Sequence, residues 1–282
     1  MPVIRPMRED DADAAIELSV VTFEAYARSR GEPPEPRPDP VTARPRYTDL
    51  IRRDPAGAWV AEQDGRLVGC AIAIRREDVW GLSLLVVDPA RQSGGLGREL
   101  LRRAHAYAEG ARGRIILSSG DPRALRSYAR LGLTGLPCFA AAGTPRGVRE
   151  PDGIRPATAA DRPFLDAVSR HVRGAAHGAD LDTFRAMGAD ILVVPERGYA
   201  VTRGRSLRQL AAFDAAGAQD VLRAVLARAG GETRVEWLSE RQAWALPVCL
   251  DAGLELRTDA GAVWLDGDVG PFSPYLPSGA FL

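Results

Sequence analysis

The chain has 282 residues and balances 37 basic against 37 acidic side chains, so its formal net charge is zero. A general binder of nucleic acid or of anionic membranes needs a basic excess, and no apolar run approaches the roughly 20 residues of a membrane span. All 37 basic side chains are arginine. The absence of lysine excludes a P-loop NTPase, a protein kinase and a pyridoxal-phosphate enzyme, because each needs a lysine at its site.

Cysteine usage and the start of the chain argue against three further classes of protein: disulfide-rich, metal-binding and secreted proteins. Cys70, Cys138 and Cys249 are far apart and odd in number, which argues against a disulfide framework. Together with the three histidines they lack the spacing of metal ligands, so we expect no metal. The N-terminus reaches charged residues at once and has no signal-peptide core, which predicts a cytoplasmic location.

Strand and helix patterns alternate through the first half of the chain. An Asp64-Gly65 turn signal between two apolar runs predicts a hairpin. The stretch Glu32–Pro45 is too proline-dense for a regular element, and we interpret it as a disordered connector or as a lid over a cleft. In chain order we expect strands at 3–5, 58–61, 67–74, 80–87 and 115–117, and helices at 11–28, 97–109 and 122–131.

The chain also repeats itself. Ile4-Arg5-Pro6 recurs as Ile154-Arg155-Pro156, and Asp11–Ser19 parallels Asp161–Ser169 at the same spacing. Each copy has the pattern of a short strand followed by an amphipathic helix with an acidic start. A breaker-rich linker at 143–153 separates the copies. We therefore predict an α/β (α+β) protein of two tandem domains, residues 1–146 and 147–282, each with a mixed central sheet flanked by helices.

The most informative segment spans residues 84–101. An apolar strand pattern ends at Pro89, passes through Gln92-x-x-Gly95-x-Gly97 and enters an amphipathic helix. Backbone N–H groups at a helix N-terminus lack partners, the helix dipole is positive there, and glycine lets an anion approach, so this turn is suited to phosphate. Leu100 stands where a dinucleotide-binding fold needs its third glycine, which excludes that motif. The alternative is a turn that only joins strand to helix.

A second constellation follows at residues 121–133. Asp121 can cap the helix, Pro122 is favoured in its first turn, and Gly132 is suited to its C-terminal cap. Tyr128 lies about two turns into this helix. Taken alone, such a tyrosine more often packs against a core than acts in catalysis. Its order and spacing after the glycine turn favour a functional role.

The two motifs together resemble those of the GCN5-related N-acetyltransferase (GNAT) superfamily, and the resemblance covers roughly residues 3 to 140. It implies acetyl-CoA as the acyl donor, with its pantetheine arm held by backbone groups at the strand end and its pyrophosphate on the loop amides. Arg91 and Arg98 add positive charge nearby. The implied cofactor-binding residues are Leu85, Val86, Val87, Gln92, Ser93, Gly94, Gly95, Leu96, Gly97, Arg98 and Asp121.

The resemblance also implies a chemistry. An acceptor amine attacks the thioester carbonyl directly in a ternary complex, and Tyr128, protonated at pH 7, gives its proton to the departing thiolate as general acid. Asp121 replaces the family's usual asparagine and adds a negative charge, and Leu133 replaces its usual phenylalanine. The general base stays open between a water relay and the carboxylates of Glu24, Glu77 and Asp78.

The second domain has the sequence of a degraded copy of the first. Cys249 stands in the tyrosine position, and we expect a buried apolar residue there rather than a nucleophile. No Gly-x-Gly occurs at 210–222, where Asp214 and Asp220 would repel a pyrophosphate, so we expect no CoA in this domain. The aromatic tail at 270–282 predicts an ordered segment on a domain surface, or one that reaches the acceptor site.

We therefore predict a cytoplasmic N-acetyltransferase that moves an acetyl group from acetyl-CoA to a primary amine on a small molecule or a peptide. The alternative is a non-catalytic acyl-CoA-binding sensor or regulatory protein, and transfer of a longer acyl group is also open. The balanced charge predicts no nucleic-acid or membrane partner. The sequence leaves the identity of the acceptor and a homodimer open.

Overall fold

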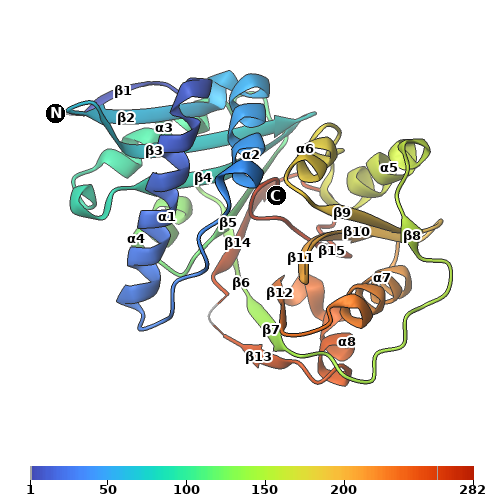
Figure 1. Cartoon of the computed structure of the whole chain (residues 1–282). Helices are drawn as coiled ribbons and strands as arrows, with labels where there is room; N and C mark the ends of the chain where they lie inside the picture. Colours follow the sequence, from blue (N-terminus) through green and yellow to red (C-terminus); the bar gives the residue numbers. More distant parts are fainter. Residues whose placement is uncertain (1, 259) are drawn as a thin grey trace. The chain divides into compact units, whose positions relative to one another are not determined.

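The computed structural model describes residues 2–258 and 260–282 (Figure 1). The chain has a mixed α/β fold, as predicted, and it divides into two compact units. Unit 1 comprises Met1–Arg75 and Trp80–Gly110, and unit 2 comprises Arg76–Val79 and Ala111–Leu282. The expected boundary between residues 146 and 147 stays a prediction. None of the helices that the structure describes is long and apolar enough to cross a membrane.

Unit 1 combines an antiparallel sheet with helices. The bounds are β1 (Val3–Pro6), α1 (Ala12–Ser29), α2 (Pro40–Arg53), β2 (Ala58–Gln63), β3 (Arg66–Arg76), β4 (Val79–Val87) and α3 (Leu96–Ala106). The strand order is β1-β2-β3-β4, and the predicted hairpin between β2 and β3 turns at Asp64 and Gly65. Helices α1 and α2 lie side by side (Figure 1), and the Tyr47 hydroxyl donates to Oγ of Ser19 at 3.0 Å.

The proline-rich segment is only partly irregular. The prediction of no regular element over Glu32–Pro45 is wrong from Pro40 onward, where α2 begins, whereas residues 32–39 form neither helix nor strand. The Asp39 side chain accepts the backbone N–H of Val41 at 3.1 Å, and Pro40 occupies the first turn, where its missing N–H costs nothing. Pro45 removes one backbone bond, and burial of an apolar helix face outweighs that cost. That face comprises Ala43, Tyr47, Leu50 and Ile51.

Unit 2 begins with an exchange of strands between distant parts of the chain. Strand β14 (Ala262–Gly267) lies between β5 (Gly113–Ser118) and β6 (Thr134–Pro137) and pairs antiparallel with both. In turn, β7 (Phe139–Gly143) lies between β12 (Thr233–Leu238) and β13 (Glu255–Arg257). Each of these groups therefore takes its middle strand from the other half of the chain (Figure 1).

This exchange predicts that the first half of the chain does not fold alone. A fragment ending at residue 146 lacks β14, so β5 and β6 each expose an unpaired edge, and β7 loses both neighbours. We expect the fragment to aggregate, while the whole chain stays in solution and unfolds cooperatively. Size-exclusion chromatography and circular dichroism of both proteins test this. A monomeric fragment with a cooperative unfolding transition would contradict the exchange.

The internal repeat predicted from the sequence is visible in matching local contacts. In the first copy Arg5 pairs with Asp11 at 2.7 Å, and in the second Arg155 pairs with Asp161 at 2.7 Å. Each aspartate also accepts a backbone N–H from three residues upstream. It thereby closes the turn before the next helix, which is α1 in the first copy and α5 (Arg162–Arg173) in the second.

The rest of unit 2 is a second sheet with its own core. The further bounds are α4 (Pro122–Arg130), β8 (Arg155–Pro156), α6 (Asp180–Ala186), β9 (Asp190–Val194), β10 (Gly198–Arg203), β11 (Ser206–Ala212), α7 (Ala215–Arg228), α8 (Leu246–Asp251) and β15 (Tyr275–Leu276). The strand order is β15-β11-β10-β9-β8. Leu210 of β11, Val221 of α7 and Ala141 of the exchanged β7 belong to one buried cluster. The exchanged strand is therefore part of this core.

Candidate functional site

The glycine turn links β4 to α3 in unit 1. The Asp88 side chain accepts the backbone N–H of Ala90 at 2.8 Å, and Gln92 donates from Nε2 to the carbonyl oxygen of Val87 at 3.0 Å. These two bonds fold the loop back onto the end of the strand. Gly95 has a φ of 86°, a left-handed conformation that favours glycine, and it leaves the first turn of α3 without a side-chain cap.

The N-terminus of α3 presents unpaired backbone donors. The first backbone bond of the helix is donated by the N–H of Glu99 to the carbonyl of Gly95 at 3.1 Å. The amides of Leu96, Gly97 and Arg98 precede it, and no residue in the described part of the chain accepts a hydrogen bond from them. These three donors lie at the positive end of the helix dipole, so the turn is suited to an anion.

Two arginines flank this helix start. Arg91 and Arg98 are exposed, and neither forms an ion pair or a side-chain hydrogen bond with any residue within 2–258 or 260–282. Their charges are therefore available to a ligand. Gly97 faces the strand end, because a Cβ built there would lie 3.4 Å from Cγ2 of Val87. Leu85 and Val86 precede Val87 as the final residues of β4, so the expected binding residues of unit 1 lie at the end of this strand and in the loop and helix start that follow it.

Tyr128 and Asp121 belong to α4 in unit 2. The Asp121 side chain accepts the backbone N–H of Arg123 at 2.8 Å and pairs with the Arg123 guanidinium at 2.6 Å, so it caps the helix as predicted. Tyr128 is buried, with 5% of its surface exposed. Burial raises the pKa of Tyr128 well above its usual value of 10.0, and the charge of Asp121 raises it further. The hydroxyl therefore carries its proton at neutral pH.

The exchanged strand supplies a neighbour for Tyr128 that sequence reasoning missed. The ring of Trp264, on β14, lies edge-on to the Tyr128 ring with centroids 6.0 Å apart. Trp264 also donates from Nε1 to Oγ of Ser118 at 3.0 Å, which fixes its orientation. No sequence signal connects the two rings, because strand exchange brings them together. Among the described residues, none forms a hydrogen bond with the Tyr128 hydroxyl.

Two of the expected general bases are bound to arginines. Glu24 pairs with Arg28 at 2.7 Å and with Arg37 at 2.9 Å. Glu77, in unit 2, pairs with Arg170 at 2.7 Å. Both carboxylates are therefore already engaged by guanidinium groups. These contacts favour neither residue as the base, and the other candidates stay predictions.

Among its described residues, the second repeat has no loop comparable to the glycine turn. Strand β11 ends at Ala212 and α7 begins at Ala215, whereas residues 88–95 separate β4 from α3. Asp214 accepts the backbone N–H of Gly217 at 2.7 Å, so its carboxylate occupies the helix start that an anion would need. Cys249 is fully buried, as predicted, and burial raises the pKa of its thiol to about 12. These contacts support the expectation that this repeat binds no CoA.

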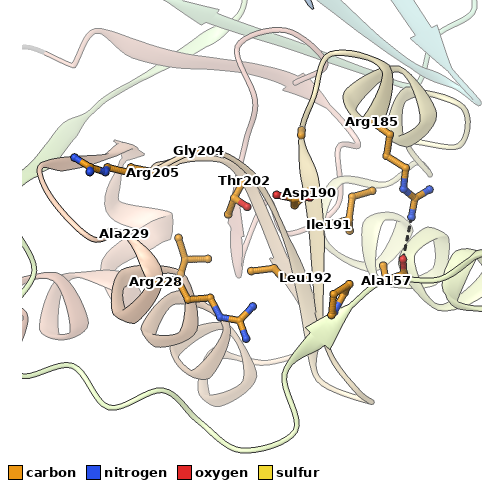
Figure 2. Close-up of a pocket in the computed structure, with 13 residues that line it drawn as sticks. Ala157, Arg185, Asp190, Ile191, Leu192, Thr202, Gly204, Arg205, Arg228 and Ala229 are labelled. Carbon is orange, nitrogen blue, oxygen red and sulfur yellow. Dashed lines mark hydrogen bonds between the residues drawn. The ribbon is translucent and has the colours of Figure 1, made fainter.

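The cavity drawn in Figure 2 lies in unit 2 and is lined by none of the expected site residues. It has a volume of about 480 Å³ and lies against β9, β10 and the end of α7. Arg185 donates to the carbonyl oxygen of Ala157 at 3.5 Å, and Arg228 pairs with Glu150 at 2.5 Å, so both cations are already engaged. We assign this cavity no part in the chemistry.

The family model for the acetyltransferase (GNAT) family matches residues 22–133. A comparison with curated proteins found no match. Among solved structures, a protein of Pyrococcus horikoshii is 15% identical with a TM-score of 0.81, and the alignment covers 100% of this chain and 96% of that one. The fold of the whole chain is therefore shared with a solved protein of nearly the same length.

Two further structures are similar over nearly their whole length. A GCN5-related N-acetyltransferase from Sphaerobacter thermophilus is 16% identical with a TM-score of 0.57, and the alignment covers 94% of this chain and 95% of that one. A tandem GNAT protein from the clavulanic acid biosynthesis pathway is 15% identical with a TM-score of 0.58, covering 95% and 98%. At these identities the likeness shows a shared fold. The segment matched by the family model contains both predicted motifs, so residues 22–133 are similar to the acetyltransferase (GNAT) family.

Proposed function

We propose that the chain transfers an acetyl group from acetyl-CoA to a primary amine. The observation that carries the proposal is the start of α3, where the amides of Leu96, Gly97 and Arg98 have no acceptor among the described residues. A helix start of this kind binds phosphate oxygens through backbone donors and dipole charge. The exposed guanidinium groups of Arg91 and Arg98 add attraction for a pyrophosphate.

The donor would lie along the expected binding residues. The backbone of Leu85, Val86 and Val87 would hold the pantetheine arm as an added strand, because its amide groups match the spacing of strand donors and acceptors. Ser93, Gly94 and Gly95 would let the pyrophosphate approach the loop backbone, since the structure has these three residues exposed. Gln92 and Asp121 contribute indirectly: Gln92 holds the loop to the strand end, and Asp121 caps α4.

The proposed reaction is a direct transfer in a ternary complex. The lone pair of the acceptor nitrogen attacks the thioester carbonyl carbon, a C–N bond forms, and the C–S bond breaks. The nitrogen loses a proton to a base or to water, and the leaving thiolate takes a proton from the Tyr128 hydroxyl. Burial of Tyr128 supports the role of acid, because it keeps the proton on the oxygen until a thiolate forms beside it.

Release of free CoA thiol in the presence of a panel of primary amines tests the proposal. We expect acetyl-CoA to be consumed only when an amine is present, with mass spectrometry showing the acetylated amine. A chain that binds acetyl-CoA tightly and turns over with none of the amines would favour the acyl-CoA sensor instead. A second arm with propionyl-CoA and longer donors measures the acyl-chain preference.

The pH profile carries a separate prediction. A general acid works only while protonated, and burial moves the ionisation of Tyr128 above its usual pKa of 10.0. We therefore expect kcat to rise as the acceptor amine loses its proton and then to stay level up to about pH 10. Turnover measured between pH 6 and pH 10 checks this. A decline in kcat that begins before pH 9 as the pH is raised, and that Tyr128→Phe abolishes, would show an ordinary or lowered tyrosine pKa. That result would contradict the assignment.

A further inference from the structure

The last residues of the chain fold into the second repeat. We call residues 270–282 the tail strap. The prediction that this segment is ordered is confirmed, because Phe272, Tyr275 and Phe281 are fully buried. We infer that the tail strap is an internal ligand that fills, in the second repeat, the cleft corresponding to the one in which the first repeat takes the pantetheine arm of its donor. The inference rests on the proposed function for the identity of that arm.

The tail strap lies against the strand of the second repeat that corresponds to β4. In the repeat, β11 corresponds to β4, because each is the strand that leads into the next helix, α7 or α3. The expected pantetheine residues, Leu85–Val87, are the last three of β4. The last three of β11 are the ones that bind the strap: β15 pairs antiparallel with Leu210 and Ala211, and the N–H of Ala212 donates to Pro274 at 3.3 Å. The strap therefore adds a strand where the donor arm would add one.

The tail strap is also bound on its opposite side. Asp121, an expected cofactor residue, precedes Gly132 in the tyrosine motif. Gln242 precedes Gly253 by the same spacing in the second copy. Gln242 is fully buried and donates from Nε2 to the carbonyl oxygen of Phe272 at 2.9 Å. The position corresponding to a cofactor residue thus binds the strap.

The neighbourhood of Gln242 adds two further bonds. Ser273 donates from Oγ to the carbonyl oxygen of Arg241 at 2.8 Å, and Arg241 donates from Nη1 to the carbonyl oxygen of Pro271 at 3.2 Å. The strap is therefore bound through its backbone on both sides, by β11 and by the turn after β12. Strand β10 pairs with one edge of β11, and β15 occupies the other edge. Strand β12, which leads into the turn on the opposite side of the strap, belongs to a different sheet.

Most side chains of the tail strap are buried and pack against particular partners. Leu276 has 2% of its surface exposed, and Phe281 lies edge-on to Phe184 with ring centroids 4.5 Å apart. The Tyr275 hydroxyl donates to the backbone oxygen of Leu282 at 2.5 Å and accepts from Nε2 of His177 at 2.9 Å. An apolar chain with regularly spaced amides has the chemistry of a pantetheine arm. The strap is thus a covalently attached substitute for it.

Hydrogen-exchange mass spectrometry on the full chain tests the inference. Leu276→Asp places a charge in a dry contact and should release the strap, so we expect exchange over residues 206–212 and 270–282 to accelerate at least about tenfold. Leu250→Asp is the matched control, because Leu250 is 51% exposed and the same substitution there should leave both segments unchanged. Unaltered exchange at 206–212 in Leu276→Asp would overturn the inference.

Pantetheine is the probe for the emptied cleft. Added in excess to the Leu276→Asp chain, it should restore slow exchange at 206–212 and leave 270–282 fast. Fast exchange at both segments in the presence of pantetheine would mean that the cleft has no affinity for such an arm. That result would overturn the inference that the tail strap takes the place of a pantetheine arm. These readouts come from the second repeat alone. Acetyl-CoA titration of the same chains reads the first repeat, so a failure of the proposed donor site is seen separately.

A milder variant keeps the test decisive if Leu276→Asp does not fold. Gln242→Leu preserves side-chain volume and removes the donor to Phe272, together with the acceptor of two hydrogen bonds from Ser239. We expect exchange over residues 270–276 to accelerate several-fold in this variant, with unit 2 unchanged outside that segment and the turn at 239–242, where the bonds from Ser239 are lost. Equal exchange in Gln242→Leu and in the unaltered chain would show that this side of the cleft does not hold the strap, and would contradict the inference.

Discussion

A chain carrying Gly97→Glu is expected to lose acetyl-CoA binding, with the dissociation constant raised at least about 100-fold, or about 2.7 kcal/mol. The new Cβ would lie 3.4 Å from Cγ2 of Val87, so the longer side chain has to extend into the loop. Its carboxylate would then compete with the pyrophosphate for the amides at the start of α3 and repel it. Equilibrium dialysis with labelled acetyl-CoA measures the change.

The second repeat provides a matched control for this substitution. Ala216 is exposed and occupies the second position of α7, as Gly97 occupies the second position of α3. Ala216→Glu therefore adds the same charge at the same helix turn, where Asp214 already caps the helix. We expect its affinity for acetyl-CoA to equal that of the unaltered chain. Retained binding in Gly97→Glu would mean that the glycine turn is structural only.

Replacing Tyr128 by phenylalanine is expected to lower kcat by about 100-fold while the affinity for acetyl-CoA stays nearly unchanged. General acids typically contribute 10²–10⁴-fold to a rate, and this substitution removes the donor proton alone. The aromatic ring remains, so the edge-on contact with Trp264 is preserved. Steady-state kinetics with a fixed amine acceptor, together with a binding titration, separates the two effects.

Tyr199→Phe controls for the loss of a buried hydroxyl as such. Tyr199 is fully buried in β10, where its hydroxyl bonds with Ser169 at 2.8 Å and accepts from Gln209 at 2.7 Å. Its removal should lower stability and leave kcat per folded molecule unchanged. If Tyr128→Phe also left kcat unchanged, Tyr128 would not be the acid, and its burial would be purely a matter of packing.

Local sequence signals predicted the elements that carry the proposed donor site. The apolar run of β4, the glycine turn and the start of α3 are contiguous, so periodicity and turn chemistry are sufficient to place them. The same holds for the cap at Asp121 and for the repeated Arg5–Asp11 and Arg155–Asp161 pairs. Each of these features depends on residues only a few positions apart.

The features that the sequence did not predict depend on distant partners. The exchange of β7 and β14 brings Trp264 to Tyr128, and the sequence around neither residue indicates this contact. Similarly, the aromatic tail was expected to be ordered, but its pairing with Leu210 and Ala211 follows only from the fold. Sequence reasoning missed the α2 helix for another reason. The prolines of the segment argue against a helix, but burial of the helically spaced Tyr47 and Ile51 determines the structure.

Isothermal titration of the purified full chain with acetyl-CoA tests the central claim most directly, because it reads affinity and stoichiometry together. We predict one site per chain, abolished by Gly97→Glu and retained in Ala216→Glu. One site is expected because residues 88–95 provide a donor loop in the first repeat, whereas Asp214 and the tail strap occupy the corresponding places in the second. Absence of binding heat at high protein concentration, or binding that survives Gly97→Glu, would contradict the account.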